Sequence, residues 1–314
     1  MVYNRTFVLA IISAVTVMIF SGCGSSTQLG LDFSADQSTS YKSTTEVIKD
    51  YRFEQPNLDK LREEQTKNLT VMNFTQTIES IDDKGVATAE ITIDALKVEI
   101  INKNEVRFSF DSQKEEDKNA PLAKLLGKSY TITISPAGKV SLVDASKAKS
   151  AVTSGYERNV VQGILAPEAI VDRHEIAALP KDRPETLSVK QTWSEVVASP
   201  PGLLAPKSYE KVYTLASING DVATVKMQAS ESGEAVKGQN TVGGMGFFAK
   251  MFDNTDDYTG WLKLNTATGK VLEYDETLIS TYVAQEMPEN GDPEKGPDTL
   301  TMGFTNRIHL EMLN

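Results

Sequence analysis

The chain has little cysteine and little histidine. Its 314 residues include one cysteine, Cys23, and two histidines, His174 and His309. A single cysteine excludes a fold held together by disulfide bonds. No second histidine stands four residues after His174, which excludes the helix of zinc proteases. A G-x-S-x-G nucleophile turn is also absent. We therefore expect a protein that is not an enzyme, with no catalytic residue and no cofactor.

Positive charge is also scarce. Lysine and arginine total 32 against 43 acidic residues, which gives a formal net charge of −11. Binding to nucleic acid, or broadly to anionic lipid headgroups, needs clusters of lysine and arginine. We expect no nucleic-acid partner. The 40% of hydrophobic residues is enough for a globular core, and the length predicts about two domains of roughly 150 residues each.

The hydrophobic run near the start is short. It covers residues 7–20, which is 14 residues, whereas about 20 are needed to span a bilayer. Arg5 precedes the run and small residues follow it, a pattern typical of an export signal. We predict a signal peptide over residues 1–22. Because cysteine occurs nowhere else, Cys23 is expected to take part in the processing of the signal peptide. The alternative is a free thiol beside an ordinary cleavage site.

The sequence FSGC at residues 20–23 resembles the lipobox of bacterial lipoproteins. In that family the cysteine thiol receives diacylglycerol, cleavage occurs just before it, and the new amino terminus is acylated, typically with palmitate. The resemblance implies a lipidated Cys23 that anchors the protein to a membrane of the cell envelope, stably because several chains act together. Gly24 stands where an aspartate would retain a lipoprotein in the inner membrane, so the outer membrane is favoured.

Residues 23–45 are rich in serine, threonine and glycine, which predicts a flexible tether after the acylated cysteine. The rest of the chain contains an internal repeat. Residues 77–91 match residues 214–227, and residues 130–144 match 261–275, with Gly138 and Gly269 at equivalent turns. We predict a duplication that gives one β-rich unit over residues 46–182 and a second over 183–314. Chance similarity between hairpins is the alternative.

Alternating hydrophobic residues predict strands at 86–93, 106–110 and 130–134. Helical spacing occurs over 117–126, and over 147–179 with a break at Pro167. A long hairpin is expected at the end, with strands over 271–283 and 300–313 and a polar tip between them. The expected fold class is α+β and predominantly antiparallel β, with two tandem curved-sheet units and short helical insertions.

A second resemblance covers most of the chain. Residues 121–140 (PLAKLLGKSYTITISPAGKV), Leu179-Pro180 and residues 189–193 (VKQTW) resemble an uncharacterised family of bacterial exported lipoproteins. Gln191 stands where that family often has glycine. At the level of the fold, the chain resembles envelope lipoprotein and lipid carriers in which a half-barrel sheet wraps around helices. These resemblances imply a location in the cell envelope and an architecture, and they imply no catalysed reaction.

The segment GGMGFFAKMFDN contains the side chains that are candidates for contacting a ligand: Met245, Phe247, Phe248, Met251 and Phe252. Three of them recur on one face of a predicted helix, which favours an ordinary core helix. The alternative is a mobile lid over an apolar cavity, since glycines precede the helix and methionine adapts to varied shapes.

The aspartates that follow, Asp253, Asp256 and Asp257, lack the alternating ligands and final glutamate of a calcium loop. They are predicted to form a solvated turn, and no metal site is expected. Two functions stay open. The first is a non-enzymatic, membrane-anchored envelope lipoprotein that binds an apolar small molecule or lipid, or a protein partner. The second is a structural or interaction module of the envelope with no ligand cavity.

Overall fold

The structure is a computed structural model that describes residues 26–181, 186–204, 207–234, 236 and 251–313. The predicted signal peptide, Cys23 and Gly24 lie outside the described residues, and so do Met245, Phe247 and Phe248. Among the helices of the described part, none combines the length and the apolar character that crossing a membrane requires.

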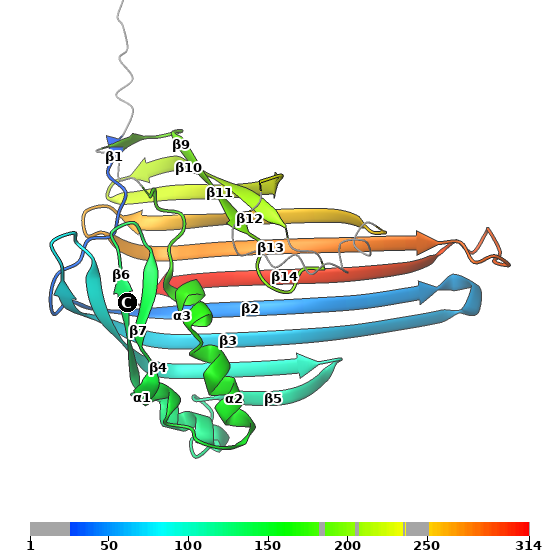
Figure 1. The fold of residues 1–314 in the computed structure, drawn as a ribbon, viewed down its shortest axis with the longest axis horizontal. Helices are drawn as coiled ribbons and strands as arrows, with labels where there is room; N and C mark the ends of the chain where they lie inside the picture. Colours follow the sequence, from blue (N-terminus) through cyan, green and yellow to red (C-terminus); the bar gives the residue numbers. More distant parts are fainter. Residues whose placement is uncertain (1–25, 182–185, 205–206, 235, 237–250, 314) are drawn as a thin grey trace, which may run out of the picture.

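Most of the described chain forms antiparallel strands, as the alternating sequence predicts (Figure 1). The strands are β1 (Ser26–Thr27), β2 (Ser38–Gln55), β3 (Lys60–Ile81), β4 (Ala87–Asn102), β5 (Glu105–Asp111), β6 (Ser129–Ile134), β7 (Val140–Asp144), β8 (Leu187–Ser188), β9 (Thr192–Ala198), β10 (Ser208–Asn219), β11 (Val222–Ser232), β12 (Asp253–Asn265), β13 (Lys270–Glu286) and β14 (Asp298–Met312). The predicted final hairpin is confirmed as β13 and β14.

Helices are few and short. The 3₁₀ helices are η1 (Pro56–Leu58), η2 (Glu115–Asp117) and η3 (Pro121–Leu125), and the α-helices are α1 (Ser146–Lys149), α2 (Gly155–Ile164) and α3 (Pro167–His174). The helical insertion predicted over 147–179 is thus three helices. Pro167 begins α3, where its missing N–H costs nothing because the first turn has no intrahelical acceptor for it.

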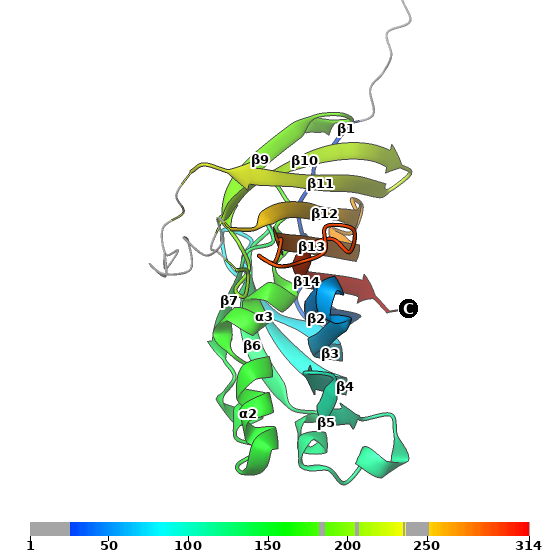
Figure 2. The ribbon, with the colours of Figure 1, turned by 90° about the vertical axis from the view of Figure 1, so that its right-hand side faces the viewer.

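One continuous sheet joins the two halves of the chain. Its order is β7-β6-β4-β3-β2-β14-β13-β12-β11-β10-β9, and β5 pairs with the other part of β4. Strands from the first predicted unit therefore lie on one side of the β2–β14 contact and strands from the second on the other. The sheet bends, and α2 and α3 lie on one of its sides (Figure 2). The prediction of a predominantly antiparallel β fold with short helices is confirmed.

The core lies between the sheet and these helices. Strand β4 shows the rule, since Ala87, Ala89, Ile91 and Ile93 are fully buried while the residues between them are not. Alternate residues of a strand point to opposite faces, so one face of the sheet carries the core. Helix α3 packs on this face against β2, β7 and β14.

Residues 26–45 do not form the predicted flexible tether. Leu29 and Leu31 are 1% and 6% exposed, and the Leu31 N–H donates to the Pro136 carbonyl at 2.8 Å. Strand β2 already begins at Ser38. The serines and threonines here occupy strand positions, with Tyr41 and Ser43 pointing into the core. The prediction of a tether was wrong because polar residues are common in loops, whereas threonine is also enriched in strands.

The first repeated hairpin keeps a detailed correspondence. In β3–β4 the register shifts between Ile78 and Ser80, and in β10–β11 it shifts between Leu215 and Ser217. Each shift leaves one extra residue, a β-bulge, at the position that the sequence match makes equivalent. The buried residues also correspond: Ile78, Ala87, Ala89 and Ile91 match Leu215, Ala223, Val225 and Met227. A shared bulge is what a duplicated hairpin would retain.

The second repeated hairpin corresponds with one correction. At the two turns the cross-strand pairs are Ile134 with Val140 and Leu264 with Val271. The difference in residue number between the two copies is therefore one residue smaller before the turn than after it. Tyr130 is buried, but Trp261 lies on the other face of its strand, so Gly260 occupies the position equivalent to Tyr130. The pairing of Tyr130 with Trp261 was wrong, because a shift of one residue reverses the face of the strand.

Both turn glycines have positive φ, but Gly269 is the more constrained. Its φ is +63°, and an added Cβ would lie 2.2 Å from the backbone nitrogen of Asp32. We expect Gly269→Ala to lower the free energy of unfolding by about 2–5 kcal/mol, from left-handed backbone and overpacking together. Gly127→Ala is the matched control, since its φ is +70° and nothing lies within 4 Å. It should lose only about 1–2 kcal/mol in denaturant titrations. Equal losses would contradict the packing of residues 29–33 on this turn.

Candidate ligand groove and buried polar cluster

A groove of about 460 Å³ lies between the inner face of the sheet and helices α2 and α3. In Figure 1 these helices cross in front of β2 to β5. The sheet contributes Thr45, Val47, Asn68, Leu69, Thr70, Val98 and Ile100, and the helices contribute Tyr156, Asn159, Val160, Gly163, Ile164, Ala169 and Arg173. This volume is within the range of about 300–1,000 Å³ that small-molecule sites occupy.

The helix side of the groove follows from the sequence of α2. Val160 and Ile164 are four residues apart and face the sheet, and both are 7% exposed. Gly163 adds no side chain, and space is open for 4 Å around the Cβ position there. At the mouth, the exposed Tyr156 ring lies 5.6 Å from that of Phe108 on β5. The walls are mostly apolar, as a site for an acyl chain or another apolar molecule requires.

Arg173 is the charged residue of the groove. It is 2% exposed, and its Nη2 donates to the Ile164 carbonyl at 3.0 Å. Its Nε and Nη1 atoms are buried and have no hydrogen-bond partner among the described residues. A buried guanidinium in an apolar site costs free energy unless an anion or acceptors compensate it.

His174, next to Arg173, lines the smaller cavity described below rather than the groove. Its Nε2 atom lies 2.7 Å from the Tyr130 hydroxyl, and its ring meets the Phe74 ring edge to face at 4.8 Å. Burial, and secondly the Arg173 charge, lower the pKa of His174 well below its ordinary value. His174 is therefore a neutral core residue. The Nδ1 atom of His309, in β14, lies 3.2 Å from a carboxylate oxygen of Asp275.

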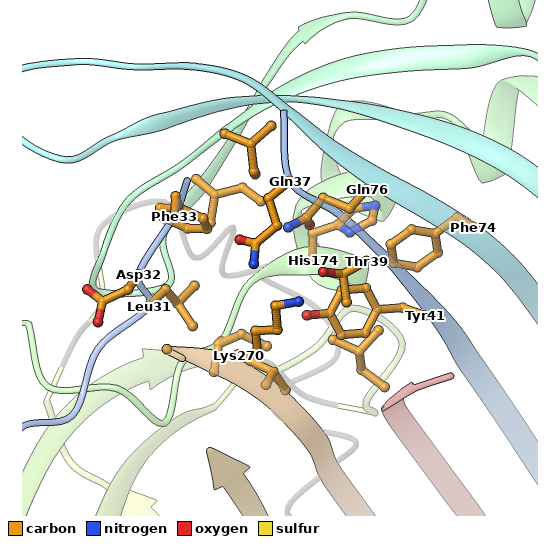
Figure 3. A pocket seen from close by; sticks show the side chains of 16 residues that line it. Leu31, Asp32, Phe33, Gln37, Thr39, Tyr41, Phe74, Gln76, His174 and Lys270 are labelled. Atoms are coloured by element: carbon orange, nitrogen blue, oxygen red, sulfur yellow. The ribbon is translucent and has the colours of Figure 1, made fainter. Parts of the chain in front are cut away.

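A smaller cavity of about 40 Å³ lies beyond His174 (Figure 3). Gln37, Tyr41 and Lys270 point into it from the N-terminal segment, β2 and β13. Its volume corresponds to one or two water-sized molecules at roughly 30 Å³ each. It is too small for a lipid, and it marks where residues 29–37 close this end of the core.

A hollow of about 930 Å³ lies over β10, β11 and β12. Most of its lining, such as Thr214, Lys226 and Trp261, alternates with buried residues and therefore lies on the outer face of the sheet. Among the described residues no helix covers this face. The groove under α2 and α3, which has two walls, is the better candidate site.

A buried polar cluster lies on the same face as the groove. The register sets Glu276 opposite Ile308, and Ile308 opposite Thr45 in the groove wall. The Lys211 Nζ atom lies 2.6 Å from Glu276 Oε1, and the Tyr274 hydroxyl donates to Oε2 at 2.6 Å. The Tyr258 hydroxyl also bonds to Oε1. We call Lys211, Tyr258, Tyr274 and Glu276 the polar cluster.

Small residues make the polar cluster possible. Lys211 is on β10 and Glu276 is on β13, so two strands separate them. Ala229 lies opposite Lys211, and Gly260 lies opposite Glu276, which leaves room for the lysine side chain to cross. A Cβ at Gly260 would lie 2.6 Å from the Asp275 carbonyl oxygen. A side chain at this position would therefore collide with the backbone of β13 beside Glu276.

Burial alone would raise the pKa of Glu276, but the Lys211 charge and hydrogen bonds from Lys211, Tyr258 and Tyr274 outweigh it. The net effect lowers the pKa of Glu276, so the carboxylate is ionised in the core. Its two oxygens already accept three donors. The arrangement is that of a structural ion pair rather than a general base. Among the described residues, no group of three or more metal-ligating side chains occurs.

The predicted Met/Phe helix is described only at its end. Met251 is in a turn and 62% exposed, while Phe252 is 9% exposed just before β12, so these two residues are not helical. The aspartates after them do not form the predicted turn but belong to β12. Asp256 accepts hydrogen bonds from Lys207 and Tyr209 at 2.8 and 2.9 Å. The Asp256 carboxylate is therefore bound by protein groups and not only by water, as the predicted solvated turn would require.

Arg173 and the polar cluster were not predicted from the sequence. A signal existed for both. Arg173 follows Ile170 by three residues and so falls on the buried face of α3. Lys211 stands between Tyr209 and Tyr213 at inward positions of an alternating strand. A charged residue at a position that the helical or the strand periodicity places in the core indicates a buried ion.

No protein-family model matches the chain. No curated protein matches it either. Among solved structures, one of lipovitellin, described as "lipid-protein interactions in lipovitellin", is similar with 11% identity and a TM-score of 0.46. The match covers 90% of this chain and 26% of the lipovitellin chain, so this chain spans about a quarter of it. A likeness this weak carries no argument about function, and the resemblance to exported lipoproteins stays a prediction.

Proposed function

We propose that the protein is a lipid-anchored envelope lipoprotein, without enzymatic activity, that binds an apolar small molecule or lipid in the groove under α2 and α3. The groove is the observation that carries this proposal. It has apolar walls on two sides, a volume of about 460 Å³ and an open mouth at Tyr156. Sites with these properties are the default binding sites of small apolar ligands.

The sequence supports the envelope location in this proposal. The lipobox at residues 20–23 and the following Gly24 favour anchoring at the outer membrane through acyl chains on Cys23. An anchored protein with an apolar groove could exchange its ligand with the membrane beside it. We assign the polar cluster a structural role and not a ligand-binding one, since its carboxylate already accepts hydrogen bonds from donors of the protein.

Filling the groove should abolish binding without unfolding the protein. We expect Gly163→Trp to weaken the binding of Nile red, a neutral apolar dye, at least tenfold in Kd. The free energy of unfolding should stay unchanged or rise by about 0.5–1 kcal/mol, because glycine is unfavourable within a helix. Gln162→Trp adds the same ring to the neighbouring residue, which is exposed and does not line the groove.

Fluorescence titrations with Nile red measure the Kd of the wild type and of both variants. Equal affinity of wild type, Gly163→Trp and Gln162→Trp would contradict a ligand groove under α2. That result would favour the other function considered for this chain, an interaction module of the envelope that presents its sheet faces to protein partners.

A further inference from the structure

We propose that the groove binds a single-chain fatty acid, whose carboxylate pairs with the Arg173 guanidinium while its acyl chain lies between the sheet and α2. This inference rests on the proposed function, because it names the class of ligand for the same groove. It adds a charge requirement that a purely apolar ligand would not have.

The geometry of Arg173 supports the charge requirement. The residue is 2% exposed and lines the groove. Nη2 donates to the Ile164 carbonyl, Nε and Nη1 have no hydrogen-bond partner among the described residues, and the guanidinium charge also acts on the Tyr130 hydroxyl. Guanidinium groups remain charged in proteins. Removing one partner of a buried ion pair is strongly destabilising, so a buried guanidinium favours an anion beside it.

The Arg173 charge acts on two neighbours, the Tyr130 hydroxyl and the Asp172 carboxyl, and opposes the larger effect of burial on the pKa of each. His174 and Tyr130 form a hydrogen-bonded pair, and burial raises the pKa of Tyr130, which keeps its hydroxyl neutral. Asp172 precedes Arg173 on α3, and burial and the Glu276 charge raise the pKa of its carboxyl while Arg173 lowers it. No ion pair joins Arg173 to a carboxylate within the described part of the chain.

The size of the groove selects the number of chains. A methylene group is close in size to a water molecule, which occupies about 30 Å³ in the liquid. A volume of about 460 Å³ therefore holds on the order of 15 such units. This is one long acyl chain, whereas a diacyl phospholipid would bring two. A carboxylate also matches the planar donor edge of a guanidinium.

A pair of photoreactive probes tests the inference on the full chain in membrane vesicles. The probes are palmitic acid and hexadecanol, each with a diazirine in the chain, and cross-linked peptides are identified by mass spectrometry. We expect the acid to label peptides of α2 and α3 at least tenfold more than the alcohol. The two probes differ only at the head group, so the ratio reports the charge requirement.

Two variants assign the requirement to Arg173. Arg173→Met should reduce labelling by the acid to the level of the alcohol, while the weaker labelling by the alcohol continues and shows that the groove remains folded. Arg173→Lys should retain part of the preference. Gly163→Trp should reduce labelling by both probes.

The outcomes separate this inference from the proposed function. If neither probe labels α2 or α3 in the wild type, the groove is not a lipid site and both ideas are wrong. Equal labelling by acid and alcohol would overturn the fatty-acid inference and leave an apolar groove. A preference for the acid that survives in Arg173→Met would overturn the assignment of the charge to Arg173.

Discussion

Replacing Lys211 by methionine is expected to lower the free energy of unfolding by about 3–5 kcal/mol at pH 7, the cost of leaving a buried charge without its partner. The side chains of Lys211 and Glu276 are 7% and 10% exposed, so water cannot replace the lost ammonium. Tyr258 and Tyr274 would still donate to the carboxylate, but they carry no charge. Chemical denaturation followed by circular dichroism measures the loss.

The pH dependence gives this prediction a specific sign. In the wild type the pKa of Glu276 is lowered, so its stabilising effect is present above the ordinary glutamate pKa of about 4.3 and is lost as the pH falls. In Lys211→Met, burial would instead raise the pKa of Glu276. The deficit of the variant should therefore be largest near pH 7 and shrink toward pH 4. The double variant Lys211→Met/Glu276→Gln should recover more than half of the loss, and no recovery would contradict the ion pair.

Replacing Cys23 by alanine is expected to remove the protein from the membrane fraction or leave it unprocessed. Cys23 is the cysteine of the proposed lipobox, and the sequence has no other cysteine that could be acylated in its place. Two or three acyl chains anchor a protein stably, whereas loss of all of them removes the affinity. Mass spectrometry of the N-terminal peptide and fractionation of cells measure the two effects.

Ser25→Ala is the control for this experiment, since Ser25 lies two residues after the cysteine and the change leaves the acylation site intact. Its protein should be acylated and membrane-bound like the wild type. Wild-type protein found in aqueous extracts with an unmodified Cys23 would contradict the lipoprotein assignment.

Periodicity predicted the sheet well because each strand has one buried face. The alternation from Ala87 to Ile93 identified β4, and the polar tip after Glu286 located the turn of the last hairpin. The same principle failed at residues 38–45, where serine and threonine fill the strand and few apolar residues mark its inner face. Local composition cannot show that a polar strand will be paired on both sides by β3 and β14.

The candidate site was harder to predict than the fold. Its walls come from β2, β3, β4, α2 and α3, which are up to about 130 residues apart in sequence. Arg173 could have been noticed as a charge at a helix core position, but its acceptors depend on how α2 ends at Ile164. The ion pair of Lys211 with Glu276 required knowing that Gly260 and Ala229 lie between them.

The central claim is that the groove under α2 and α3 holds an acyl chain, and the lipids that co-purify with the protein test it most directly. A soluble form should begin at Gly24, because Leu29 and Leu31 are buried and β2 starts at Ser38. Lipids extracted from this form and from its Gly163→Trp variant are quantified by mass spectrometry. We predict close to one fatty acid per wild-type chain and at least a tenfold lower amount in the variant. Equal amounts in the two proteins, or no lipid in the wild type, would contradict the claim.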